Sequence, residues 1–131
     1  MIADTSAWID FIRATGSVAH LKLKRALQRR EPIWMVDTVY QELLQGARNP
    51  HDYMRMEEFL DALPSWEPEN PREIARHAAT LYARCRWQGV TLRSSNDCLI
   101  AVCAIEAGQK LLHADRDFDH IASIEPSLRF V

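Results

Sequence analysis

Four acidic residues are the positions of this 131-residue sequence best suited to chemistry: Asp4, Glu42, Asp97 and Asp115. Two of them, Glu42 and Asp97, stand among apolar neighbours. Asp4 follows three residues that suit a short buried strand, and Asp97 begins the almost entirely apolar run CLIAVCAI. Carboxylates are rarely buried unless they are paired or bind a cation. If several converge, their mutual repulsion raises their pKa values until a divalent ion compensates. Oxygen ligands without His or Cys at metal-ligand spacing favour Mg²⁺, with Mn²⁺ as a substitute, over zinc.

Each of these acids also has an ordinary structural explanation. Asp4 and Asp115 could each cap the helix that follows, and Glu42 could lie on a helix surface. Asp97 stands three residues after Ser94, an arrangement similar to a capping box. Only a fold that brings the four side chains together favours a shared chemical role.

The rest of the chain predicts short strands that alternate with helices. Apolar runs predict strands at 2–4, 33–36, 110–115 and 128–131, with a strand residue pair around Trp66. Apolar spacing predicts helices at 7–13, 18–28, 39–47, 51–63, 72–88, 96–108 and 117–124. Ser6 is the expected cap of the first helix, and Asp37 or Thr38 that of the third.

Strands separated by helices indicate an α/β fold with a mostly parallel sheet. In such a sheet, ligands bind outside the carboxyl ends of the strands. Asp4 and Asp115 both stand where a predicted strand ends. The sequence therefore places both side chains in the same crevice.

The composition is that of an ordinary globular domain, with 47% hydrophobic and 26% charged residues. No apolar run approaches the ~20 residues of a membrane span, and we expect no signal peptide. Cys85, Cys98 and Cys103 form no CxxC pair, which favours a reduced, cytoplasmic setting. The net charge of −2 lacks the basic excess typical of nucleic-acid binders, although KLKRALQRR (22–30) is locally basic.

Four segments resemble the PIN domain, in particular the VapC-type toxin ribonucleases of toxin–antitoxin pairs. They are DTSAWIDF (4–11), VYQELLQGA (39–47), SSNDCLIAVCA (94–104) and HADRDFDHIA (113–122). Together they span nearly the whole chain, in the order and at the spacing usual for the family. The resemblance implies one PIN domain over residues 1–131, built as a three-layer α/β/α sandwich with a central, mostly parallel sheet of four to five short strands.

The resemblance also implies a Mg²⁺-dependent endoribonuclease that acts as a toxin on an RNA substrate. Asp4 and Asp97 would be the principal ligands of the ion, and Glu42 and Asp115 would complete the pocket. Ser6, or less favourably Thr5, would support the water shell of the ion.

Three further residues near the last acid are expected at the edge of this site. Asp115 should face the site, while Asp117 and Asp119 lie on its rim. His113 stands where the family often has threonine, serine or another small polar residue. It could contact a phosphate, donate a proton, or fill the edge of the strand.

The resemblance further implies a cognate VapB-type antitoxin, a homodimer, a hetero-oligomer with the antitoxin, and no membrane association. Apolar residues at Trp8, Phe11 and Ile12, together with the helix around Tyr53 and Phe59, could form the antitoxin groove. Trp8 could equally belong to the core. Phosphate contacts need only a local basic strip, for which 22–30 and the arginines Arg86 and Arg93 are candidates.

Three other functions remain open from the sequence. A PIN-like module without catalysis would bind RNA or a partner through the same fold. Another Mg²⁺-dependent phosphohydrolase, such as a phosphatase with an aspartyl nucleophile, often carries a second acid two residues after the first, where this chain has Ser6. A DNA-directed or 5′-flap-type nuclease usually needs clamp elements that 131 residues can hardly contain.

Overall fold

The computed structural model describes residues 1–131. Its elements are β1 (Ile2–Ala3), α1 (Thr5–Ile12), α2 (Val18–Gln28), α3 (Asp37–Gln45), α4 (Pro50–Asp61), α5 (Pro71–Trp87), α6 (Asn96–Glu106), β2 (Leu111–Leu112) and α7 (Asp117–Ile124). Every helix expected from the sequence is present, and the ends agree within two residues. Caps account for much of this agreement, since Ser17, Asn49 and Asn70 each accept a backbone N–H in the first turn of α2, α4 and α5.

Two short strands meet at the centre of the fold, where β1 and β2 pair in parallel. Three single parallel bridges flank them: Ile2–Trp34, Met35–Ser65 and Leu111–Phe130. The expected sheet of four to five strands is therefore not confirmed. The segments at Trp34 and Ser65 follow Pro32 and Pro64, and a proline has no N–H to donate to a strand ladder.

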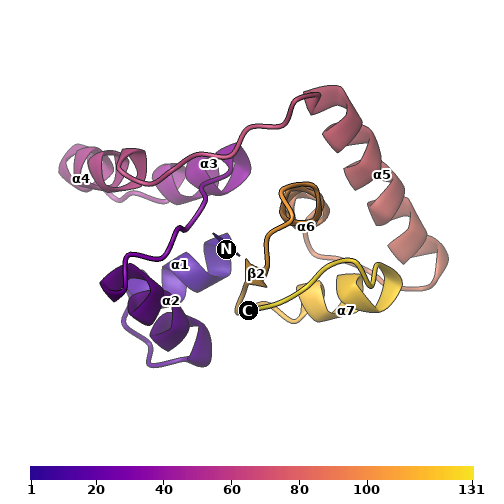
Figure 1. Ribbon diagram of the computed structural model, residues 1–131, viewed down its shortest axis with the longest axis horizontal. Helices are drawn as coiled ribbons and strands as arrows, with labels where there is room; N and C mark the ends of the chain where they lie inside the picture. The colour runs from indigo at the N-terminus through magenta and orange to yellow at the C-terminus, as the bar shows by residue number, and fades with distance from the viewer.

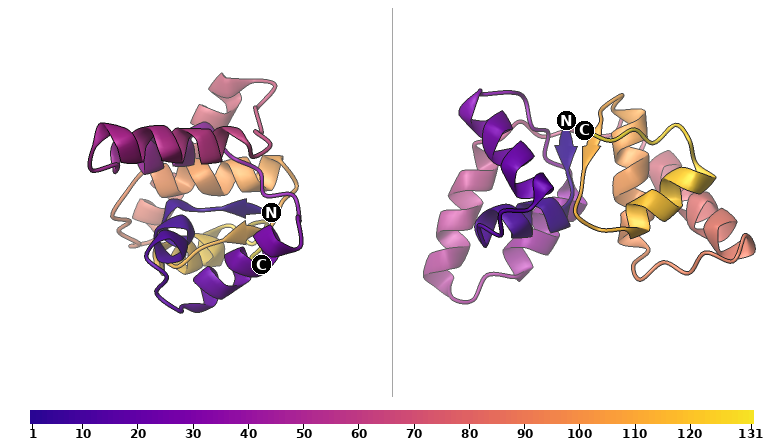
Figure 2. Two further views of the ribbon diagram at one scale, coloured as in Figure 1. Left: turned by 90° about the vertical axis from the view of Figure 1, so that its left-hand side faces the viewer. Right: turned by 90° about the horizontal axis from the view of Figure 1, so that it is seen from below.

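Helices cover both sides of the strand pair, as an α/β fold requires. Figure 1 and the right panel of Figure 2 show α1 to α4 on one side of β1 and β2, and α5 to α7 on the other. The two ends of the chain lie close together beside the strands (Figure 2). None of the helices combines the length and apolar character needed to cross a bilayer.

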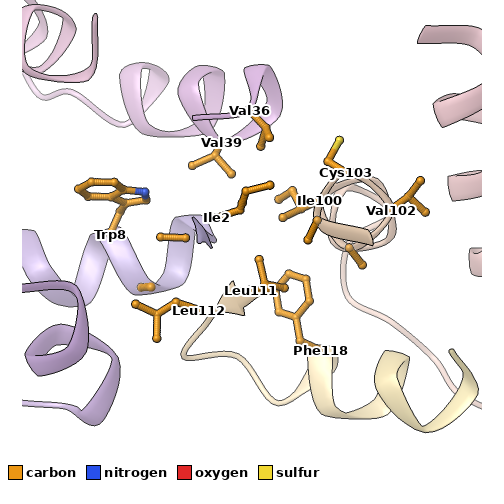
Figure 3. Close-up of a cluster of buried hydrophobic side chains, with 14 of the residues drawn as sticks. Ile2, Trp8, Val36, Val39, Ile100, Val102, Cys103, Leu111, Leu112 and Phe118 are labelled. Atoms are coloured by element: carbon orange, nitrogen blue, oxygen red, sulfur yellow. The ribbon is translucent and has the colours of Figure 1, made fainter. Parts of the chain in front are cut away.

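One cluster of 30 buried residues joins both groups of helices to the strands. Figure 3 shows Ile2 and Leu111 of the strands at its centre, with Val39, Ile100 and Phe118 around them. Among the helices, α6 is the most buried, because its residues Cys98 and Ile100 to Ala104 are all buried. Packing against α5, α3 and α7 surrounds α6, which explains why its sequence is apolar without periodicity.

Two expected helix caps are wrong. Asp4, and not Ser6, is the N-cap of α1, and its carboxylate accepts the Ser6 amide. The helix starts earlier than expected because β1 is only two residues long and Asp4 turns directly from the strand into the helix. The N-cap of α3 is Val36, without a side-chain hydrogen bond, so Asp37 and Thr38 lie inside the helix.

A matched pair of leucine substitutions tests this core. Leu111 is fully buried in β2, whereas Leu21 on α2 is 55% exposed. We expect Leu111→Ala to lower the free energy of unfolding by about 2–5 kcal/mol, because it removes buried surface and leaves a cavity. Leu21→Ala should change it by no more than about 0.5 kcal/mol. Urea unfolding followed by circular dichroism measures both, and equal losses would contradict the burial described here.

Candidate active site

The site begins at the carboxyl ends of the two strands, where a serine bridges them. The Asp4 amide donates to the Leu112 carbonyl (2.8 Å), which continues the strand pairing by one step. The Ser6 hydroxyl donates to Asp4 Oδ2 (2.5 Å) and accepts from the Ala114 amide (3.0 Å). Asp4 is 4% exposed, so these contacts hold a nearly buried carboxylate beside the end of β2.

A threonine connects the second acid to the same corner. The Thr5 hydroxyl on α1 donates to Glu42 Oε1 on α3 (2.9 Å). This contact brings a carboxylate from the middle of α3 toward Asp4, and the charge of Glu42 acts on both Asp4 and Asp97. Thr5 and Ser6, which were expected to support the water shell of an ion, thus each donate a hydrogen bond directly to one acid.

Three further acids form a compact group. One carboxylate oxygen from each of Asp97, Asp115 and Asp117 lies within 4.8 Å of the other two. Asp97 is in the first turn of α6, Asp115 follows β2, and Asp117 begins α7. Asp117 was expected on the rim, but it is buried, with 3% exposure. The fold thus groups three carboxylates by distance, and the charges of Asp4 and Glu42 act on one of them, Asp97.

An arginine that the sequence analysis assigned only to a basic strip lies on this group. The Arg93 amide and Nε each donate to Asp117 Oδ2 (3.1 Å), and Nη2 donates to Asp115 Oδ1. Arg93 precedes Asp97 by four residues in the loop before α6. That proximity in sequence was the available signal, but an arginine in a loop has too many possible partners for the contact to be inferred.

His113 fills the edge of the strand. Its ring packs against Phe118 and Phe130, with centroids 5.2 Å and 4.4 Å away. Nδ1 accepts the Asp115 amide (3.3 Å), and Nε2 lies 3.6 Å from the carboxylate of Asp119. The packing and the contact with Asp115 favour a positioning role over phosphate binding or proton donation. Asp119 lies on the rim, with most of its side chain in solvent.

The electrostatics divide the site into two halves. Burial raises the pKa of Asp97 to about 7, and the charges of the other four acids add to the effect. Burial also raises the pKa of Asp4, although hydrogen bonds from Ser6 oppose the shift. Burial pushes the pKa of Asp117 in the same direction, but the contacts and charge of Arg93 outweigh it and hold this pKa below its usual value. Negative charge is therefore compensated at Asp117 and uncompensated around Asp97.

This donor set fits a hard divalent cation. All the donors are carboxylate oxygens, which suit Mg²⁺ or Mn²⁺. Sulfur ligation is excluded at Asp97, because the neighbouring Cys98 is fully buried and its thiol contacts that of Cys85. The His113 ring is occupied by the Asp115 amide and by its aromatic neighbours. The uncompensated carboxylates around Asp97 are where a cation would relieve the strongest repulsion.

Trp8 belongs to the core. It is 1% exposed and packs edge-on against Phe11 and Phe59. Its indole N–H is the one fully buried side-chain polar atom without a hydrogen-bond partner. A partner could therefore contact Phe59, which is 44% exposed, but not Trp8 itself without rearrangement of the helices.

Comparison with known proteins finds a matching family and similar sequences. The profile of the PIN domain family matches residues 1–124. VapC ribonuclease Mb1587 of Mycobacterium bovis and ribonuclease VapC11 of Mycobacterium tuberculosis are each 39% identical to the chain over 125 residues, which are 95% of this chain and 92% of the relative.

Solved structures of low sequence identity share the fold. The structure of VapBC2 from Rickettsia felis bound to a DNA fragment from the promoter aligns with a TM-score of 0.72 and 18% identity, over 99% of this chain and 96% of the other. VapBC-1 from nontypeable Haemophilus influenzae aligns with a TM-score of 0.74 and 22% identity, over 99% and 95%.

Replacing the least compensated acid should stabilise the metal-free protein. The pKa of Asp97 is about 7 in the folded chain and 3.8 as its ordinary value, so its ionisation opposes folding increasingly from about pH 4 to 7 and fully above that range. In the presence of EDTA, we expect Asp97→Asn to raise the free energy of unfolding by about 1–2 kcal/mol at pH 8, after allowance for screening of a half-exposed group. The gain should shrink toward pH 4, as measured by urea unfolding across this range.

Asp117→Asn provides the contrasting control. Because the pKa of Asp117 is lowered in the folded chain, ionised Asp117 stabilises the fold at any pH above the ordinary pKa of an aspartate. This stabilisation is lost only as the pH falls through the lowered pKa. We therefore expect Asp117→Asn to lower the free energy of unfolding by about 1–3 kcal/mol at pH 8. If Asp97→Asn and Asp117→Asn changed the free energy of unfolding in the same direction, the difference in charge compensation between the two acids would be contradicted.

Proposed function

The chain belongs to the PIN-domain family, and from this membership we propose that it is a Mg²⁺-dependent endoribonuclease, the toxin of a toxin–antitoxin pair. The observation that supports the proposal is that oxygens of Asp97 and Asp115 lie within 4.8 Å of each other, while the charges of Asp4 and Glu42 also act on Asp97. We take residues 1–131 as one PIN domain. The bridged segments at Trp34, Ser65 and Phe130 would extend its sheet toward the four to five strands expected for the family.

The four acids would hold the ion. Asp4 and Asp97 are the proposed principal ligands, and Glu42 and Asp115 complete the pocket directly or through water. A bound divalent ion supplies a lowered pKa for the attacking water and stabilises negative charge on the phosphate. The oxygen-only donors and their uncompensated charge support this assignment.

The protein contributes by holding these groups in place before substrate binds. Ser6 fixes one oxygen of Asp4, and Thr5 fixes one oxygen of Glu42. His113 accepts the Asp115 amide and so steadies the segment that leaves β2. Such prior placement lowers the cost of reorganisation during the reaction. No covalent nucleophile is needed, and Cys98 is unsuited to that role because burial raises the pKa of its thiol to about 12.

RNA is the proposed substrate. The net charge of −2 does not favour nucleic acid globally, so phosphate contacts must come from local basic strips. The segment 22–30 and the arginines Arg86 and Arg93 are the candidates. In a homodimer, which we propose, two such strips would line one channel that leads to both sites.

A VapB-type antitoxin is the proposed inhibitor, in a hetero-oligomer located in the cytoplasm. Ile12 on α1 and Phe59 on α4 are 54% and 44% exposed, and Phe59 packs on the buried Trp8. Tyr53 and Met54 of α4 are also exposed. Helices α1 and α4 therefore present apolar side chains that a partner segment could cover. The three free, buried cysteines suit a reducing compartment.

Nuclease assays test the proposed activity. We expect the purified chain to cleave labelled RNA with Mg²⁺ or Mn²⁺ and to lose cleavage in EDTA. Asp4→Asn and Asp97→Asn should each lower the rate at least about 100-fold, because each removes a charged ligand from the ion. Gel electrophoresis of the labelled RNA gives the rate.

Glu58→Gln is the matched control for Glu42→Gln in this assay, because both variants remove the charge of one glutamate. Glu58 is exposed on α4 outside the acidic site, so its replacement should leave the rate unchanged. Cleavage that persists in EDTA would refute the proposal. RNA binding without cleavage would indicate a module that has lost catalysis, and preferential cleavage of DNA would indicate a different nuclease.

Charged substitutions test the antitoxin surface. We expect Ile12→Asp and Phe59→Asp to weaken binding of the antitoxin encoded beside the gene by at least about 10-fold, because each places a charge in an apolar contact. Trp87→Asp is the control, since Trp87 is 73% exposed on α5, on the other side of the strands. Isothermal titration calorimetry measures the affinities, and an equal effect of Trp87→Asp would place the interface elsewhere.

A further inference from the structure

Arg93 is the only Lys or Arg side chain with a hydrogen bond to the five acids of the site. Its backbone amide and its Nε both donate to Asp117 Oδ2, at 3.1 Å each. Its Nη2 donates to Asp115 Oδ1. The side chain of Asp117 is only 5% exposed, so the anchor of this guanidinium is nearly buried. Arg93 is thereby fixed at the mouth of the acidic group although two thirds of its own side chain is exposed.

The hydrogen bonds of Asp117 separate it from the other four acids. Its Oδ2 accepts both Arg93 bonds, and its Oδ1 faces His120 Nδ1 at 3.8 Å. Oδ2 of Asp117 is therefore occupied by Arg93, whereas the approach of His120 to Oδ1 is too long for a hydrogen bond. Asp117 belongs to the acidic group by distance, and its two hydrogen bonds with Arg93 hold the guanidinium at that group.

Each of the other acids keeps at least one oxygen without a side-chain partner. Ser6 takes Oδ2 of Asp4, and Thr5 takes Oε1 of Glu42. At Asp115, Oδ1 accepts Arg93 Nη2 and the Asp117 amide (3.0 Å), which leaves Oδ2.

Asp97 has no hydrogen bond from any side chain, so both of its oxygens remain available to an ion, and one of them lies within 4.8 Å of an oxygen of Asp115. In two-ion sites, the second ion lies about 3.5–4 Å from the first and needs carboxylates of its own. The carboxylates available for it here, Asp115 and Asp117, already accept the Arg93 guanidinium. A second ion at these carboxylates would have to displace the Arg93 guanidinium and break its charge-assisted hydrogen bonds to Asp117 and Asp115.

We propose that Arg93, anchored on Asp117, takes the place of a second divalent ion, so that the pocket of Asp4, Glu42, Asp97 and Asp115 loads a single ion. This inference rests on the proposed function. The guanidinium then supplies the positive charge that a second ion would bring to the RNA phosphate. Arginine suits this task, because its planar donors match the oxygens of a phosphate and its charge persists at every working pH.

The stoichiometry of metal binding tests the proposal. Isothermal titration calorimetry with Mn²⁺, at pH 7.5 and without RNA, should give one ion per chain for the wild type. Arg93→Gln should give two ions, because the carboxylate of Asp115 and that of Asp117 lose their resident cation. Arg93→Lys, which keeps a cation, should return to one ion. Arg72→Gln is the control, since Arg72 is exposed on α5 without a charged partner, and this variant should also bind one ion.

Arg93→Met, similar in length and uncharged, provides a second variant if Arg93→Gln does not fold, as judged by circular dichroism. Two ions bound to the wild type would overturn the proposal. One ion in both uncharged variants would overturn it as well, while leaving the metal-dependent nuclease intact. Absence of any bound Mn²⁺ in the wild type would instead refute the proposed function on which the inference rests.

Discussion

Repulsion between carboxylates is the constraint around which this structure is organised. Asp97, Asp115 and Asp117 lie close together, the charges of Asp4 and Glu42 also act on Asp97, and burial removes much of the water that would screen these charges. Hydrogen bonds from neighbouring residues offset this electrostatic cost at individual acids. Ser6 donates to Asp4, Thr5 donates to Glu42, and Arg93 neutralises Asp117. Asp97 is left without such help, which is why its pKa is the most strongly raised of the acids.

The core supplies the stability that permits this arrangement. Helix α6 carries Asp97 in its first turn and is buried along most of its remaining length. Its contacts with α5, α3 and α7 fix its position and thus that of Asp97. A surface helix could turn an unfavourable carboxylate toward water. A helix packed against three others cannot rotate, so the Asp97 carboxylate stays where the fold places it.

The helices and the family resemblance could be predicted from the sequence, because periodic apolar residues and caps are local signals. Fine detail of the sheet could not, since strands of two residues carry almost no pattern and the prolines limit pairing. Asp4 was read as either a cap or a site residue, but its two oxygens let it accept the Ser6 amide while one oxygen remains for other contacts. Arg93 and Asp117 were misjudged because their importance comes from a contact 24 residues apart in sequence, which no local pattern records.

The Ser6 hydroxyl has a further consequence for how the two strands align. The ladder between β1 and β2 contains only two residue pairs, too few to specify its own alignment firmly. A slip by one residue would turn every side chain of β1 to the opposite face, so that Asp4 would point into the core and Ala3 toward the acids. Because Ser6 contacts both Asp4 and the Ala114 amide, it can make its two bonds only when the strands are correctly aligned. The same hydroxyl that orients a carboxylate therefore also favours the observed alignment of the two strands.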